Sequence, residues 1–147
     1  MKKILALSLV SFALFANDII VKESCVSVDD TVYKLKEVLK SKNLGIFAVI
    51  NHSGNAAAVD MKLNESKMIV FGNPRLGTAL MQQDMKVGLD LPLRVLVYKD
   101  VDGKVKMAYR DGSWLKNKHL LDAPKKVQKM NKAMEMFTTK AAQCSND

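Results

Sequence analysis

The sequence predicts an α+β fold of two layers, in which a mixed, mostly antiparallel sheet of about five strands carries helices packed on one side. Short apolar or alternating segments, typical of strands, occur between segments with helical periodicity in the order β-α-β-β-α-β-β-α. A helical turn after the second strand and a short helix before the last complete this series. The strands are too few and too unevenly interleaved with helices for a doubly wound parallel sheet.

The first sixteen residues, MKKILALSLVSFALFA, have the pattern of a Sec-type signal peptide. Lys2 and Lys3 precede a mostly apolar stretch of about a dozen residues, which is too short for a membrane span, and Ala16 suits the position before a cleavage site. We therefore expect export to the periplasm or secretion, the alternative being a retained N-terminal anchor. Residues 17–147 are expected to form a single domain, with 122–147 as a C-terminal helix packed on it and no transmembrane segment after cleavage.

The charge of the chain is basic, with a net charge of +8 that becomes +6 once residues 1–16 are removed. Such an excess can indicate nucleic acid or anionic lipid as a partner, but export argues against nucleic acid. The basic residues are spread along the chain, and the two clusters, 34–42 and 125–132, are typical of solvated helix faces.

The first half of the mature chain begins with a strand over 19–24, followed by a helix that Ser27 or Asp29 can cap. Asn43 and Gly45 are typical of the end of that helix. Residues 46–50 are wholly apolar, which predicts a strand in the centre of the sheet. A loop with a helical turn near 56–59 then leads to a third strand over 68–71.

The second half of the chain begins with a helix for which Asn73 is the expected N-cap and Pro74 the first helical residue, running to about Gln83. Gly77 costs this helix about 1 kcal/mol relative to alanine, which suggests that another group approaches its backbone closely.

Two further strands follow, over 93–99 and 105–109, with Asp102-Gly103 as the hairpin turn between them. A short helix over 113–119 precedes the last helix, which Asp122 is expected to cap.

The last helix carries an apolar stripe that aims Cys144 at the body of the protein. Cys25 and Cys144 both survive signal cleavage, and an even number of cysteines in an oxidising compartment predicts a disulfide between them. The alternative is two separate thiols, of which one is redox-active, although no C-x-x-C motif is present.

The 72–78 segment, GNPRLGT, has the frame of a phosphate loop, but Thr78 stands where the loop requires lysine. This excludes nucleoside triphosphate binding. The helix start and Arg75 can still bind a carboxylate or a small phosphate, the alternative being that Arg75 faces water. Asp90 and Arg94 flank Pro92, and either they pair with each other or Arg94 holds an anionic ligand near the 72–78 loop.

His52 directly follows the predicted central strand, so it can act as an acid or base or as an axial ligand to haem, the alternative being a hydrogen-bonded loop residue. Met81 and Met85 can line an apolar pocket or pair with His52 at a non-covalent haem. The absence of C-x-x-C-H excludes covalent c-type haem. His119, in a lysine-rich turn, is read as structural. The methionines of the last helix suit core packing better than copper, and no metal site is predicted.

The pattern FGNP…GT..M…LDLPLR over 71–94, together with DDTVYKLKEVLKSKNLGIFAVINH upstream, resembles domain-of-unknown-function family 302 (DUF302), a family of small bacterial proteins. The resemblance runs over 20–122. It implies a two-layer α+β fold and no established activity. Similar proteins often carry Asn/Asp-His at 51–52, and proline is common where this chain has Met85.

The leading interpretation is an exported module that binds a small anionic or apolar ligand and forms a homodimer through an exposed sheet edge. A second interpretation is an enzyme in which His52 is the acid/base and Arg94 and Asn73 stabilise charge. A third is a structural or interaction protein of the envelope. The candidate ligand-binding residues are His52, Asn73, Arg75, Thr78, Asp90 and Arg94.

Overall fold

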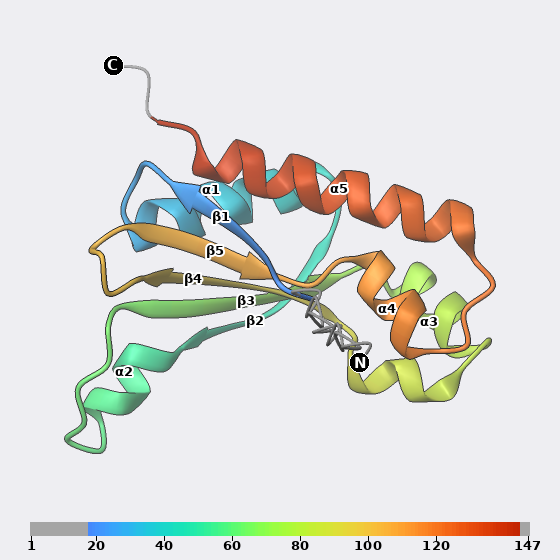
Figure 1. Ribbon diagram of the computed structural model, residues 1–147, viewed down its shortest axis with the longest axis horizontal. Helices are drawn as coiled ribbons and strands as arrows, with labels where there is room; N and C mark the ends of the chain where they lie inside the picture. The colour runs from blue at the N-terminus through green and yellow to red at the C-terminus, as the bar shows by residue number, and fades with distance from the viewer. Residues whose placement is uncertain (1–17, 145–147) are drawn as a thin grey trace, which may run out of the picture.

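The computed structural model describes residues 18–144, so the predicted signal peptide lies outside the described residues (Figure 1). Its elements follow the predicted order, and a short 3₁₀ helix, η1, stands where a loop was expected. The elements are β1 (Ile20–Ser24), α1 (Val28–Ser41), β2 (Gly45–Asn51), α2 (His52–Ala57), β3 (Ser66–Gly72), α3 (Pro74–Met81), η1 (Met85–Leu89), β4 (Leu93–Lys99), β5 (Val105–Tyr109), α4 (Gly112–Lys118) and α5 (Pro124–Ala142).

The five strands form one sheet in the order β1-β5-β4-β3-β2, and every neighbouring pair is antiparallel. Helices α1 and α5 lie on one face of this sheet (Figure 1). No element within residues 18–144 covers the other face, which is called the uncovered face below. The predicted α+β class, with helices on one side of a five-stranded sheet, is confirmed.

The core lies between the sheet and the two long helices. Alternate residues of the inner strands point toward α1 and α5, as period-two strands require. The rings of Phe71 on β3 and Phe137 on α5 meet edge to face, with centroids 6.3 Å apart. The largest fully buried side chains are Phe71, Leu35, Leu39, Ile69, Leu80, Met107, Leu115 and Met134.

The prediction that residues 46–50 form a central strand is wrong, because β2 is an edge strand that pairs only with β3. Phe47 and Val49 are 55% and 42% exposed. A continuous apolar run is typical of a strand buried on both faces. The position of a strand within a sheet depends on partners that are distant in sequence, and the run alone does not fix it.

Local turn and cap chemistry follows the sequence at three of the predicted positions. The Ser27 side chain accepts from the Asp30 N–H, and the Asn73 side chain accepts from the Arg75 and Leu76 N–H groups. Gly103 has a φ of 81° in the β4–β5 turn, a conformation that glycine adopts without steric cost.

Two local predictions are wrong. The last helix begins after Ala123 and has no side-chain cap, so Asp122 does not cap it. A methyl group added at Gly77 would meet only Leu91 Cδ1, at an ordinary 3.9 Å, so no other group approaches this glycine closely.

Cys25 and Cys144 form the predicted disulfide, with Cα atoms 5.3 Å apart and a separation of 119 positions in sequence. The bond ties the turn after β1 to the end of α5. Because Cys25 follows the edge strand β1, this link fixes the end of α5 to that edge of the sheet.

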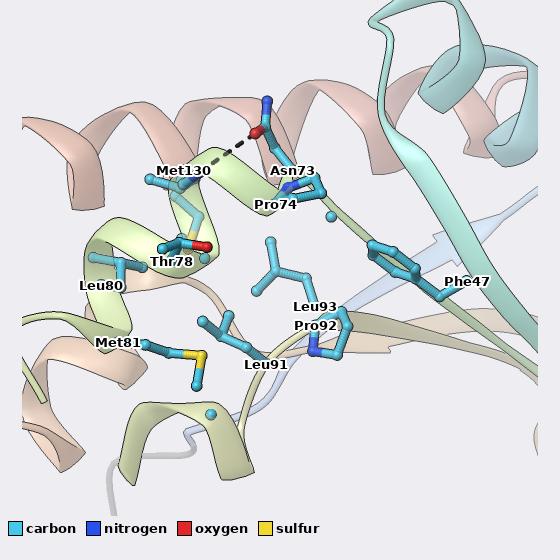
Figure 2. Close-up of a pocket in the computed structure, with 14 residues that line it drawn as sticks. Phe47, Asn73, Pro74, Thr78, Leu80, Met81, Leu91, Pro92, Leu93 and Met130 are labelled. Atoms are coloured by element: carbon cyan, nitrogen blue, oxygen red, sulfur yellow. Dashed lines mark hydrogen bonds between the residues drawn. The ribbon is translucent and has the colours of Figure 1, made fainter. Parts of the chain in front are cut away.

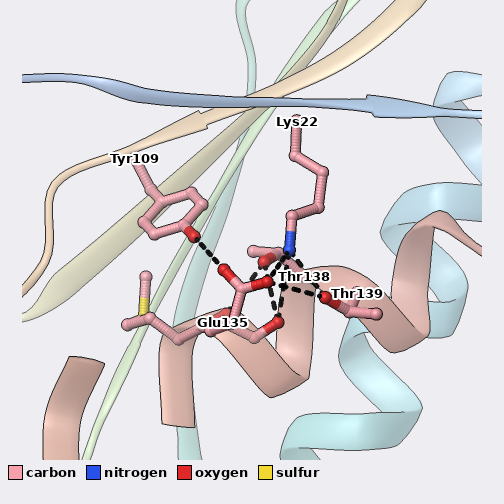
Figure 3. A network of polar contacts seen from close by, with 6 residues as sticks. Lys22, Tyr109, Glu135, Thr138 and Thr139 are labelled. Carbon is pink, nitrogen blue, oxygen red and sulfur yellow. Dashed lines mark hydrogen bonds and ion pairs between the residues drawn. The ribbon is translucent and has the colours of Figure 1, made fainter. Parts of the chain in front are cut away.

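A polar network fixes the same helix further along its length (Figure 3). Lys22 on β1 forms a 2.8 Å ion pair with Glu135 on α5 and donates to the Thr139 hydroxyl at 2.6 Å. The Tyr109 hydroxyl donates to the other oxygen of Glu135 at 3.4 Å. The Lys22 ammonium holds the pKa of Glu135 below its usual value, whereas burial raises the pKa of Tyr109.

Candidate functional site

A pocket of about 220 Å³ lies where α3, η1 and the start of β4 meet (Figure 2). The labelled side chains of Met81, Leu91 and Leu93 point into it, and Phe47 of the edge strand closes one side. The remaining lining residues are Gly72, Asn73, Pro74, Leu76, Gly77, Thr78, Leu80, Gly88, Pro92 and Met130. The wall is therefore almost entirely apolar, with Asn73 and Thr78 as its polar side chains.

A second pocket, of about 540 Å³, adjoins the first on the side of α5. The two share Gly72, Asn73, Leu76, Leu93 and Met130, so we treat them as one site and call it the α3–α5 crevice. The second pocket alone is lined by Lys42, Leu44, Phe71, Lys126, Lys129, Ala133, Met134, Met136 and Phe137. The crevice has an apolar interior whose charged lining residues are all lysines.

The local sequence explains how the crevice is formed. Asn73 starts α3 immediately after β3, so the helix begins at the end of the sheet. The first pocket lies between this helix and the start of β4. The Leu91–Pro92 peptide is cis, and Pro92 lies in the wall just before β4 begins. Met130 reaches the crevice from α5, which contributes the opposite wall.

A cluster of two carboxylates and an imidazole fixes the two ends of η1, whose Gly88 lines the first pocket. The Asp84 side chain accepts from the Lys86 N–H at 3.0 Å and from the Leu120 N–H at 3.2 Å. Nε2 of His119 lies 2.6 Å from Asp90 Oδ2, and its Nδ1 lies 3.6 Å from Asp84 Oδ2. The backbone hydrogen bond from Leu120 is the main cause that lowers the pKa of Asp84.

This cluster holds His119 in contact with Asp84 and Asp90. The contact agrees with the prediction that His119 is a structural residue, although its partners were not predicted. Its side chain is only 9% exposed. Asp84 and His119 are 35 positions apart, so no local spacing connects them. The only indication of this contact in the sequence is that both side chains can carry a charge.

Of the predicted ligand-binding residues, Asn73 and Thr78 line the crevice. Arg75 is exposed in the first turn of α3 and lines neither pocket of the crevice. Its exposure agrees with the alternative in which its guanidinium faces water.

Asp90 and Arg94 line a different pocket, of about 250 Å³, together with Arg110 and Trp114. The predicted Asp90–Arg94 pair is wrong, because Asp90 contacts His119 and Arg94 Nη2 donates to the Leu89 carbonyl at 3.2 Å. Arg110 stacks over the Trp114 ring, 4.5 Å from its centroid. This pocket of about 250 Å³ adjoins the uncovered face rather than the crevice.

His52 lies at the opposite end of the sheet, and its inclusion in one site with the 72–78 loop is wrong. The β2–β3 register places Gly45 beside Gly72, whereas Asn51, next to His52, pairs with Lys67. Gly45 and Asn51 are six positions apart along β2, which is about 20 Å. An enzyme site that joins His52 to Arg94 and Asn73 is therefore not assembled, nor is a haem site that pairs His52 with Met81 or Met85.

Within residues 18–144, no group of three or more His, Cys, Asp and Glu side chains is arranged to hold a metal ion. The same residues include no helix that is long and apolar enough to cross a bilayer. The lysines of the crevice are the site residues that sequence reasoning did not find. Lys126 and Lys129 are separated by about 50 positions from the α3 loop and carry only the signal of a basic helix face.

Comparison with known families gives a match over residues 20–137 to the family described as "Domain of unknown function DUF302". A solved structure, an uncharacterised conserved DUF302 protein from Bacillus stearothermophilus, superposes with a TM-score of 0.68 over 86% of this chain and 97% of the other. The two sequences are 16% identical, so this likeness concerns the fold.

Two curated relatives are each 37% identical over 99 residues, which is 67% of this chain. They are proteins of Brucella suis biovar 1 (strain 1330) and Brucella abortus biovar 1 (strain 9-941), both named "Fluoride-specific ion channel FluC 1". This chain spans only 39% and 37% of their lengths. The activity in that name is the activity of the whole relatives.

Proposed function

Because the chain belongs to the DUF302 family, whose description carries no activity, we propose from its site that it is an exported binding module for a small, largely apolar ligand. The observation that carries this proposal is the α3–α5 crevice, formed by adjoining pockets of about 220 and 540 Å³. Ligand sites in proteins are typically concave, of about 300–1,000 Å³, and lined by apolar side chains with a few polar groups.

The side chains of the crevice suit a ligand of variable shape. Met81, Met130, Met134 and Met136 all contribute to its wall. Methionine is unbranched and polarizable, so it adapts to an irregular partner with little strain. Asn73 and Thr78 supply polar groups at one side, which is enough to orient a bound molecule.

The pocket that contains Asp90 and Arg94 is the weaker candidate. Its two guanidinium groups already have partners, because Arg94 donates to the Leu89 carbonyl and Arg110 stacks on Trp114. Part of their hydrogen-bonding and stacking capacity is therefore already used. A homodimer remains a prediction, and the exposed edge strand β2 is the surface that supports it.

The proposal is tested by titrating purified mature protein with N-phenyl-1-naphthylamine, a neutral apolar dye that fluoresces when it leaves water. We expect saturable binding that Gly77→Phe abolishes, since Gly77 lines the first pocket and has only Leu91 Cδ1 within 4 Å of an added Cβ. Removing a glycine from a helix interior also favours folding.

The matched control is Gln82→Phe, an exposed position at the end of the same helix that lines neither pocket. It should bind the dye as the wild type does. If folded Gly77→Phe protein binds the dye with unchanged affinity, or if the wild type does not bind it, the crevice is not a ligand site.

A further inference from the structure

The charged side chains at the crevice are all of one sign. Lys42 follows the end of α1, and Lys126 and Lys129 lie on α5, so the three reach the second pocket from two separate helices. All three are exposed. Among residues 18–144, none of them forms an ion pair with a carboxylate, and no Asp or Glu lines either pocket of the crevice.

The interior beside these lysines is apolar and deep. Phe71, Met134 and Phe137 line the second pocket and are at most 5% exposed, so its floor lies within the hydrophobic core. Through Leu76 and Met130 this pocket adjoins the first one, which extends the apolar surface toward α3 and η1. A molecule that matches both parts has one anionic end and an apolar chain.

We propose that the ligand of the α3–α5 crevice is a free fatty acid, an inference that rests on the binding function proposed above. The carboxylate lies among Lys42, Lys126 and Lys129, where it is attracted by three positive charges and stays in contact with water. The alkyl chain lies against the apolar wall, where each buried methylene strengthens binding about fourfold until the crevice is filled.

The experiment measures binding of decanoate and dodecanoate by isothermal titration calorimetry at low ionic strength, with decanol as the neutral analogue of equal chain length. We expect one fatty acid per chain, tighter binding of dodecanoate than of decanoate, and weaker binding of decanol. Added salt should weaken the binding of the acids, because exposed charges are screened, but not that of decanol.

The decisive variant replaces the three lysines together, as Lys42→Gln, Lys126→Gln and Lys129→Gln. Exposed ion pairs contribute modestly, so we expect decanoate affinity to fall about tenfold while decanol affinity stays the same. A control with the same net charge replaces lysines of α5 that line neither pocket, as Lys125→Gln, Lys132→Gln and Lys140→Gln. This control should bind decanoate as the wild type does.

Each other outcome overturns a defined part of the inference. If decanol binds as tightly as decanoate and the lysine variants bind both equally, the fatty-acid assignment fails and the apolar binding site stands. If the control variant loses as much affinity as the crevice variant, general charge attraction replaces the site. If neither compound binds and the neutral dye does not bind, both proposals fail.

Discussion

Asp84 joins two segments that are distant in sequence, because one carboxylate oxygen caps η1 and the other accepts from the Leu120 backbone N–H. The carboxyl side chain is only 8% exposed, and His119 lies beside it. The pKa of Asp84 is lowered, first by the hydrogen bond from Leu120 and then by that from Lys86. Its charged form is therefore the one that stabilises the folded state.

Replacing Asp84 by asparagine should lower the melting temperature at neutral pH. A carboxyl group whose pKa is depressed on folding contributes stability above its unfolded value of about 3.9, and this contribution is lost as the pH falls through the lower folded value. The difference in melting temperature between wild type and Asp84→Asn should therefore shrink below about pH 4. Circular dichroism at a series of pH values measures it.

Asp60→Asn provides the control for this comparison, since Asp60 is exposed and its φ of 58° is one that asparagine tolerates. It should melt close to the wild type at every pH. A difference between wild type and Asp84→Asn that is the same from neutral pH to about pH 2 would contradict the role given to the ionised carboxylate.

Among single residues, the sequence identified those whose role is local. Asn73 precedes a proline at a helix start, which indicates a cap, and it also lines the crevice. His52 was placed in the site because it follows an apolar strand, but the register of that strand puts it at the other end of the sheet. Lys126 and Lys129 gave only the signal of a basic helix face, which does not indicate a site.

Helix α3 is the element that shapes the crevice, and its start depends on one side chain. Asn73→Ala removes the oxygen that accepts from the Arg75 and Leu76 N–H groups, at 2.9 and 3.3 Å. We expect the free energy of unfolding to fall by about 1 kcal/mol, as for other N-cap deletions. Urea denaturation of the ligand-free protein measures this change.

Asn73→Asp retains an acceptor at the same position and adds a negative charge at the positive end of the helix, so it should be at least as stable as the wild type. Equal losses in the alanine and aspartate variants would show that the cap bond is not the cause. This pair of variants separates capping from the packing of the side chain.

The order of elements could be predicted from sequence because caps, periodicity and turns are local. The position of β2 could not, because its neighbours in the sheet are chosen by contacts across the whole chain. The sequence GIFAVI has the apolar character of a buried strand, yet β2 lies at the edge. The full lining of the α3–α5 crevice could not be predicted for the same reason, since its residues come from six separate elements, β2, β3, α3, η1, β4 and α5.

At the scale of the whole molecule, the Cys25–Cys144 bond and the Lys22–Glu135 ion pair hold α5 to the β1 side of the sheet. Replacing both cysteines by serine should lower the free energy of unfolding by about 4–5 kcal/mol, the value of the chain-entropy model for a loop of this size. Urea denaturation of the double variant and of oxidised wild type measures it.

Wild type treated with a thiol reductant should unfold at the same urea concentration as the double variant. A loss below about 1 kcal/mol would show that the other contacts of α5 suffice without the covalent link. Because α5 also supplies one wall of the crevice, the same proteins can be titrated with the neutral dye.

The same bond makes residues 25–144 a covalently closed ring. The segment between β2 and β3 projects from this ring, α2 within it has no buried residue, and Val59, Met61 and Leu63 after it are more than half exposed. A protease that cuts once in this segment opens the ring without dividing the molecule. The nicked protein keeps the mass of one chain plus one water until its disulfide is reduced, and only then separates into two pieces.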